Sequence, residues 1–178
     1  VESIASLARM ASTHGLKEVA HWKSPIHGGS FVTIFTPSPI NEYENSTTPT
    51  EVLQACKTFS VSQDSYFCRL REFIEDKRDK GHKLAGFGAA HKTTVTCSAA
   101  HLSGREIDFL VDSNPDLSGL YTPESRIQIF KPETLLEMDA DLILIFATAH
   151  ESEIQEQYTS FLRPNSRFVS IIDSPQVI

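Results

Sequence analysis

Residues 83–92 read KLAGFGAAHK and are the strongest indication of the fold in this chain. A short apolar run leads into a turn with two glycines, Gly86 and Gly88, and the turn leads into a segment that can be helical. The next apolar run, residues 107–111, is followed at once by Asp112. A strand, a glycine turn, a helix and a second strand tipped with an acid form the opening of a nucleotide-binding α/β unit.

The glycine turn has two interpretations. Glycines let the backbone approach a phosphate closely, and the helix that follows Ala89 presents free N–H groups at its N-terminus. Lys92 falls in the first turn of that helix and adds a positive charge. The full dinucleotide fingerprint has a third glycine, and His91 stands in its place. The turn is therefore either a phosphate site or a purely structural connection.

Residues 82–178 alternate between strand and helix patterns. Strands are expected over 83–87, 107–111, 127–130, 142–147 and 167–172, and helices over 90–99, 132–138 and 151–162. Because residues 142–146 (LILIF) show no polar alternation, their strand should be buried on both faces, as in a parallel sheet. The expected fold class is α/β, with a Rossmann-like, doubly wound and mostly parallel sheet.

Ligands of such sheets bind beyond the carboxyl ends of the strands. The residues expected at that edge are Gly86, Gly88, Ala89, Lys92, Asp112, Asn114 and the turn 148–151, which ends with Glu151. Asp112 can bond the hydroxyls of a ribose, or it can cap the turn at Asn114. Glu151 can contact a ligand, or it can be favoured only by the dipole of the helix that it begins.

The first 36 residues predict a helix and two strands, which precede the sheet just described. Apolar residues between Ile4 and Ala11 recur at helical spacing, Gly15 ends the helix, and strands follow over 17–22 and 30–36. Residues 37–50 are rich in Pro, Ser, Thr and Asn and predict a linker. A connecting helix is expected over 51–81, with its clearest periodicity over 63–80.

Composition argues against several classes of protein. The formal net charge of −7 disfavours non-specific binding to nucleic acid or to anionic membranes. No apolar run approaches the ~20 residues of a membrane span, and we find no signal peptide. The three cysteines lack zinc or redox spacing, which is typical of a reducing compartment with thiols that mostly pack. We therefore expect a cytoplasmic protein, and the absent initial methionine is consistent with a piece of a longer one.

Several short motifs, in this order, resemble one protein family. They are His27-Gly28-Gly29-Ser30 before a strand, residues 86–92, Val111-Asp112-Ser113-Asn114-Pro115, Gly119, Tyr121-Thr122-Pro123, Glu153-Ile154, Gln157 and the strand that ends near Pro175. Their order and spacing are similar to those in the C-terminal part of SAM-dependent sugar C-methyltransferases, which methylate NDP-keto-deoxysugars. The resemblance covers nearly the whole chain.

The resemblance implies a division of labour within a longer enzyme, a transferase. A zinc-binding piece and a SAM-binding domain would precede this region, residues 1–36 would end the methyltransferase fold, and residues 82–178 would hold the nucleotide sugar. The catalytic base, the SAM loop and the zinc cysteines would lie upstream of Val1, so this chain would bind no cofactor and would not catalyse alone. His27 would face the joint between the two parts and orient substrate or shuttle a proton; otherwise it is a turn histidine bonded to backbone.

The chain departs from the family pattern in three places. Glu124 replaces a glycine after Tyr-x-Pro, residues 146–150 (FATAH) replace a Trp-Asn pair, and Asp173-Ser174 replace a Pro-rich sequence. Two other functions therefore stay open. One is a stand-alone module that binds another nucleotide, NAD(P) or a CoA compound, at the same turn, and the other is an interaction domain that binds no ligand.

Overall fold

The computed structural model describes residues 4–25, 30–38, 49–172 and 176–177. The chain divides into two compact units, Val1–Ser60 and Val61–Ile178, and each is described by itself. One long helix, α2 (Pro49–Asp79), runs through the boundary between them. All of the residues expected at the ligand edge belong to the second unit, whereas His27, expected at the joint between the two parts, lies outside the described residues.

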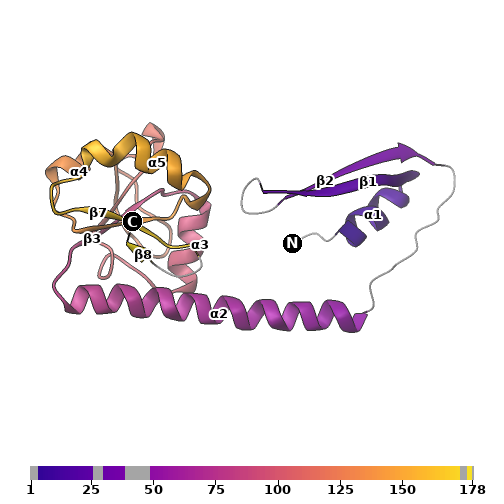
Figure 1. The fold of residues 1–178 in the computed structure, drawn as a ribbon, viewed down its shortest axis with the longest axis horizontal. Helices are drawn as coiled ribbons and strands as arrows, with labels where there is room; N and C mark the ends of the chain where they lie inside the picture. Colours follow the sequence, from indigo (N-terminus) through magenta and orange to yellow (C-terminus); the bar gives the residue numbers. More distant parts are fainter. Residues whose placement is uncertain (1–3, 26–29, 39–48, 173–175, 178) are drawn as a thin grey trace. The chain divides into compact units, whose positions relative to one another are not determined.

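The first unit contains a helix and a two-stranded antiparallel sheet (Figure 1). Helix α1 (Ile4–Ser12) packs against β1 (Leu16–Ser24), which pairs with β2 (Ser30–Pro37). Gly15 makes the turn from helix to strand at a φ of +69°, a conformation that glycine adopts without strain. The helix and two strands expected from the first 36 residues are confirmed.

The second unit contains a sheet with the strand order β5-β4-β3-β6-β7-β8 within the described part of the chain (Figure 1). The strands are β3 (Leu84–Phe87), β4 (Phe109–Val111), β5 (Ile129–Phe130), β6 (Leu142–Ile145), β7 (Arg167–Ser170) and β8 (Gln176–Val177). Strands β3 to β7 are parallel, whereas β8 runs antiparallel to β7. The expected α/β fold with a mostly parallel sheet is confirmed.

Helices cover both faces of this sheet. Successive side chains of each strand point to opposite faces, so each face has its own buried cluster. On one face, Leu84 of β3 and Leu144 of β6 pack with Leu70 and Ile74 of α2 and with Cys97 of α3 (His91–Ala99). On the other face, a second buried cluster joins strand residues to α4 (Thr134–Glu137) and α5 (Glu151–Tyr158). Residues Leu142–Ile145 are therefore buried on both faces, as their uniformly apolar sequence predicts.

The structure extends the sequence-based elements in two places. Helix α2 begins at Pro49, two residues before the expected start at residue 51, and its residues 50–60 are exposed. Strand β8 has no counterpart among the expected strands, since its two residues are too short to form a pattern. No described helix is both long enough and apolar enough to cross a membrane.

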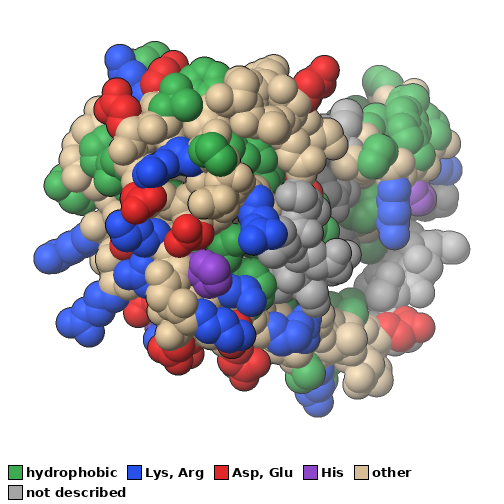
Figure 2. Space-filling model, turned by 60° about the vertical axis from the view of Figure 1, so that its left-hand side comes forward, with side chains coloured by type: hydrophobic (Ala, Val, Ile, Leu, Met, Phe, Trp, Pro, Cys, Tyr) green, Lys and Arg blue, Asp and Glu red, His purple; other side chains and the backbone are tan. Residues whose placement is uncertain are grey.

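The amino ends of the strands carry intermingled charges of both signs. Asp139 forms ion pairs with Lys83 at 2.9 Å and with Arg163 at 2.6 Å, and the hydrogen bond from Lys83 and the charge of Arg163 hold the pKa of Asp139 below its ordinary value. Arg78 pairs with Asp108 at 2.7 Å. Figure 2, in which this side comes forward, shows Lys and Arg side chains interspersed with Asp and Glu. These pairs fasten α2 and the loops to the sheet, and positive and negative side chains alternate on this side of the described residues.

Glu124 occupies the position at which the resembled family has glycine. The backbone conformation at this position explains why the family has glycine there. The φ of Glu124 is +62°, in the left-handed region, where a side chain costs about 1 kcal/mol. Its carboxylate accepts a hydrogen bond from the Ser98 hydroxyl at 2.6 Å, which offsets part of that cost. The loop after Thr122 thus keeps its shape despite the missing glycine.

We expect Glu124→Gly to unfold at a higher urea concentration than Glu124→Ala. Both variants lose the hydrogen bond to Ser98, but only glycine relieves the left-handed backbone, so the glycine variant should be more stable by about 1 kcal/mol. Urea unfolding followed by circular dichroism measures the difference. Equal midpoints for the two variants would show that this backbone is not strained.

Candidate functional site

The candidate site lies where the strand order of the sheet reverses, between β3 and β6. The loops that leave two such neighbouring strands run in opposite directions, which opens a crevice beyond their carboxyl ends. Gly88 follows β3, and a Cβ built on it would lie 2.8 Å from the Cβ of Ala147, which follows β6. The Gly88 N–H donates to the carbonyl of Val111, at the end of β4, at 2.8 Å. The ends of three strands therefore meet at Gly88.

The two glycines of the turn have different roles. Gly88 has a φ of +94°, which favours glycine, and its close approach to Ala147 leaves no room for a side chain. Gly86 lies inside β3 and is buried in the core. A Cβ on it would lie 2.5 Å from Leu110 and 2.7 Å from the Phe146 ring. Packing alone accounts for Gly86, so only Gly88 shapes the turn itself.

The N-terminus of α3 has the features of an anion site. Its N-cap, Ala90, makes no side-chain capping hydrogen bond, and its first turn contains no acidic residue. Within the part of the chain that the structure describes, the N–H groups of Ala90, His91 and Lys92 donate to no protein acceptor. These groups carry the partial positive charge of a helix N-terminus. The exposed Lys92 stands in the same turn, as the sequence predicts.

Asp112 ties the glycine turn to the loop after β4. One carboxylate oxygen accepts the Ala89 N–H at 2.6 Å, and the other accepts the Asn114 N–H at 2.8 Å. The side chain of Asn114 in turn accepts the Asp116 N–H and caps a short 3-10 turn, Pro115–Leu117. Asp112 therefore caps the turn at Asn114, and each of its oxygens keeps a lone pair for a further donor. A contact with ribose stays a prediction.

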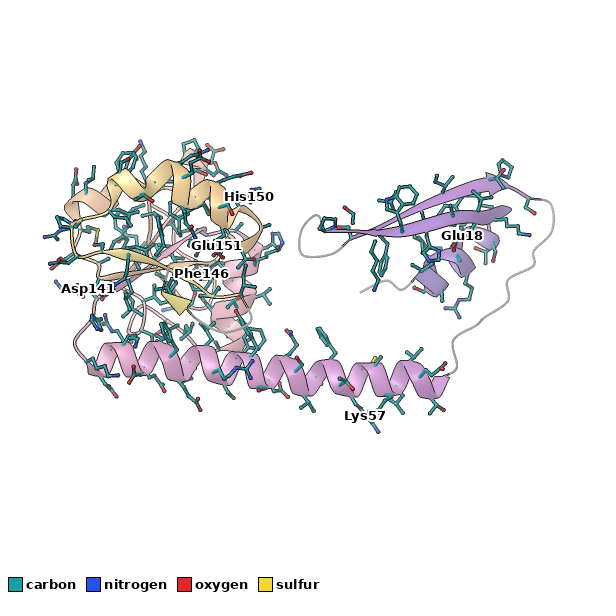
Figure 3. All side chains as sticks on the ribbon, viewed as in Figure 1. Glu18, Lys57, Asp141, Phe146, His150 and Glu151 are labelled. Carbon is teal, nitrogen blue, oxygen red and sulfur yellow. The ribbon has the colours of Figure 1, made fainter. Side chains whose placement is uncertain are left out.

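Helix α5 begins at the same edge, but its N-terminus already carries negative charge. Glu151 and Glu153 lie in its first turn, and His150 contacts Glu153 at 2.9 Å. The Glu151 carboxylate accepts a hydrogen bond from the Ser170 hydroxyl, at the end of β7, at 2.9 Å. Figure 3 shows His150 and Glu151 at the side of the sheet opposite Asp141. Of these two helix N-termini, that of α3 suits a phosphate better.

Ser170 and Ala147 carry no signal in the sequence that marks them as site residues. Ser170 is 9% exposed and lies on the strand after the one that leads to Glu151, so only the parallel register of β6 and β7 brings the two side chains together. Ala147 is a small residue of a kind that carries no chemical signal. Each is recognised only once the order of the strands is known.

A cavity of about 470 Å³ lies at the other, amino edge of the sheet. His82, Asp141 and Arg167 line it, and His82 lies 3.8 Å from Asp141. Ligand crevices of parallel sheets open at the carboxyl edge, where the helix N-termini point. We therefore place the site at Gly88 and not in this cavity.

Cys97 of α3 is close to the site in sequence but takes no part in it. The side chain is fully buried, and this burial raises the pKa of the thiol to about 12, so the thiolate is not formed at neutral pH. Cys56 and Cys68 are exposed, which corrects the expectation that the thiols mostly pack. Among the described residues, no three His, Cys, Asp or Glu side chains gather as a metal site.

Comparison with known proteins agrees with this architecture. Residues 25–173 match the family described as the C-methyltransferase C-terminal domain. The chain is also 28% identical over 187 aligned residues to C-methyltransferase NovU of Streptomyces niveus. That alignment covers 99% of this chain and 44% of NovU, so the chain spans less than half the length of this relative.

Proposed function

This chain belongs to the C-methyltransferase C-terminal domain family, and we propose that it holds the nucleotide sugar of a SAM-dependent C-methyltransferase at the carboxyl edge of its sheet. The proposed substrate is an NDP-keto-deoxysugar. The observation that carries the proposal is the N-terminus of α3, which has neither a side-chain cap nor an acidic residue and lies at the reversal of the strand order. The motifs around it resemble those of sugar C-methyltransferases, and this resemblance is our reason for proposing a nucleotide sugar as the ligand.

The charges at this edge orient the proposed ligand. A pyrophosphate would accept hydrogen bonds from the N–H groups of Ala90 and His91, with Lys92 beside it. It would avoid α5, where Glu151 and Glu153 would repel it. The Asp112 carboxylate has lone pairs left for ribose hydroxyls, and Glu151, held by Ser170, can accept a hydrogen bond from another hydroxyl of the ligand.

The proposed enzyme replaces a proton next to a keto group by the methyl group that SAM supplies. We assign SAM, zinc and the catalytic base to the part of the protein that precedes this chain, and we assign no catalytic residue within it. The contribution of this chain is then to bind and orient the substrate, which lowers the entropic barrier of the methyl transfer. The chain alone should bind nucleotide and not methylate it.

Isothermal titration calorimetry of the chain with UDP, TDP and their sugar conjugates tests this proposal. We expect at least one of these compounds to bind, and NAD and CoA to bind more weakly or not at all. Tighter binding of NAD or CoA would instead support the stand-alone nucleotide module. The absence of heat with every compound, in a protein shown to be folded by circular dichroism, would support the interaction domain and contradict the proposal.

We expect Lys92→Ala to weaken nucleotide binding about tenfold, or about 1–2 kcal/mol, because it removes a charge-assisted contact with phosphate. Lys92→Arg should keep most of the affinity. The matched control is Lys80→Ala, which removes an exposed lysine that directly follows α2 and pairs with Asp76, away from the site. Calorimetry at low and at high salt measures the effect, and the loss should shrink at high salt. Equal affinity of Lys92→Ala and Lys80→Ala would place the phosphate elsewhere.

A further inference from the structure

One face of α2 packs on the core of the second unit. Leu70 and Ile74 are fully buried there, and Tyr66, Phe67 and Phe73 pack against the same cluster. Such residues recur at steps of three and four positions, so they lie on one side of the helix. The hydroxyl of Tyr66 also donates to the carbonyl of Ile171 at 2.7 Å, which fixes the rotation of α2 about its own axis in this unit.

The same side of α2 carries further apolar residues toward the N-terminus of the helix, beyond the polar Ser62 and Gln63. Continuing in steps of three and four from Leu70, it reaches Phe59, Cys56 and then Val52 with Leu53. These residues are exposed: Val52 by 50%, Leu53 by 57% and Phe59 by 61%. We call Val52, Leu53, Cys56 and Phe59 the exposed stripe. The polar residues Gln54, Lys57 and Thr58 lie on the other sides of this helical segment, and Figure 3 shows Lys57 on it.

An uncovered apolar stripe on a helix calls for a partner. Removing apolar surface from water contributes roughly 25 cal/mol per Å², so side chains as large as Phe59 and Leu53 supply a strong drive toward burial. Because the stripe continues the face that is already buried farther along α2, a single partner surface on this side would complete a regular helix packing.

We propose that the exposed stripe docks on the part of the full-length methyltransferase that precedes Val1. The inference rests on the proposed function, that is, on this chain being the C-terminal part of a longer enzyme. The relative NovU is more than twice as long as the segment aligned with this chain, so a protein built like it has ample chain to cover the stripe. Docking there would set where the nucleotide-binding edge is held with respect to the methyl donor.

The cysteines of the chain provide a direct test without any mutation. Cys56 lies in the exposed stripe, whereas Cys68 lies on the outer side of the same helix, about 120° around the axis from it. Cys97 is buried with a raised pKa and reports only global unfolding. Short pulses of N-ethylmaleimide are applied to the chain alone and to the full-length protein. The modified peptides are then quantified by mass spectrometry, with Cys68 as the internal reference.

In the chain alone, Cys56 and Cys68 should react at similar rates at every protein concentration. In the full-length protein, Cys56 should react at least tenfold more slowly than Cys68. Equal rates in the full-length protein would overturn the proposal. Protection of Cys56 in the chain alone would also overturn it: concentration-independent protection would mean that the chain covers its own stripe, and concentration-dependent protection would mean that a second copy does.

A pair of variants tests whether docking of the exposed stripe is what protects Cys56 from N-ethylmaleimide. In the full-length protein, Phe59→Asp should restore rapid labelling of Cys56, whereas Gln54→Asp, on the other side of the same helical segment, should leave it protected. Nucleotide binding by the chain alone does not involve this surface. A full-length protein that methylates its substrate while Cys56 stays reactive would therefore contradict the docking and leave the proposed function intact.

Discussion

Gly86→Ala is expected to lower the free energy of unfolding by about 1–3 kcal/mol, although it adds a single methyl group. That methyl carbon would lie 2.5 Å from Leu110 Cδ2 and 2.7 Å from the Phe146 ring. Leu110 is fully buried and Phe146 is 2% exposed, so neither can move aside without disturbing the core. Guanidinium unfolding followed by circular dichroism measures the loss.

The chain offers a matched control and a way to assign the cause. Gly104→Ala adds the same methyl group where the nearest atom lies 3.9 Å away, and it should change stability by less than about 0.5 kcal/mol. Phe146→Leu should cost less in the Gly86→Ala background than in the natural sequence, because it relieves the overlap. If Gly86→Ala is as stable as Gly104→Ala, packing does not explain this glycine, and a role in ligand binding becomes the better account.

Asp112→Ala is expected to have two separate effects. It leaves the N–H groups of Ala89 and Asn114 without their acceptor, which should lower the free energy of unfolding by about 1–3 kcal/mol. It also removes the proposed ribose contact, so nucleotide should bind about tenfold more weakly. Chemical denaturation measures the first effect, and calorimetry on the folded variant measures the second.

Two further variants separate the effects at Asp112. Asp112→Asn keeps one oxygen that can accept a backbone N–H, so it should recover part of the stability. Asp116→Ala removes a nearby exposed acid whose side chain forms no hydrogen bond or ion pair in the described structure, and it should match the parent in both measurements. A stable Asp112→Ala protein would contradict the capping geometry, and one that binds normally would contradict the ribose contact.

The arrangement of the sheet could be predicted because each of its signals is local. Residues 142–146 are apolar without alternation, and a strand that is buried on both faces has that composition. The turn at Gly88 and the acid after residues 107–111 fix the start of the unit. The connecting helix over 51–81 is indicated mainly by the periodicity of residues 63–80, because residues 50–60 are exposed and mix apolar with polar side chains.

The candidate site was predictable in outline and not in detail. The sequence places Gly88, Lys92 and Asp112 at one edge, and the structure brings all three to the carboxyl ends of β3 and β4. The sequence does not reveal that Gly86 is required by core packing or that Asp112 accepts the Ala89 N–H, because both depend on atoms from other strands. Likewise, only the register of β6 with β7 joins Glu151 to Ser170.

The reversal of strand order has a consequence for how the second unit folds. Leu84 pairs with Leu142, roughly sixty positions later, whereas β4 pairs with strands that are much closer along the chain. Closing the longer loop loses more chain entropy, so we expect the union of β3 with β6 to come late in folding. Gly88 and Ala147, which follow these two strands, come together only after that step, so the proposed nucleotide would bind and stabilise only the fully folded unit.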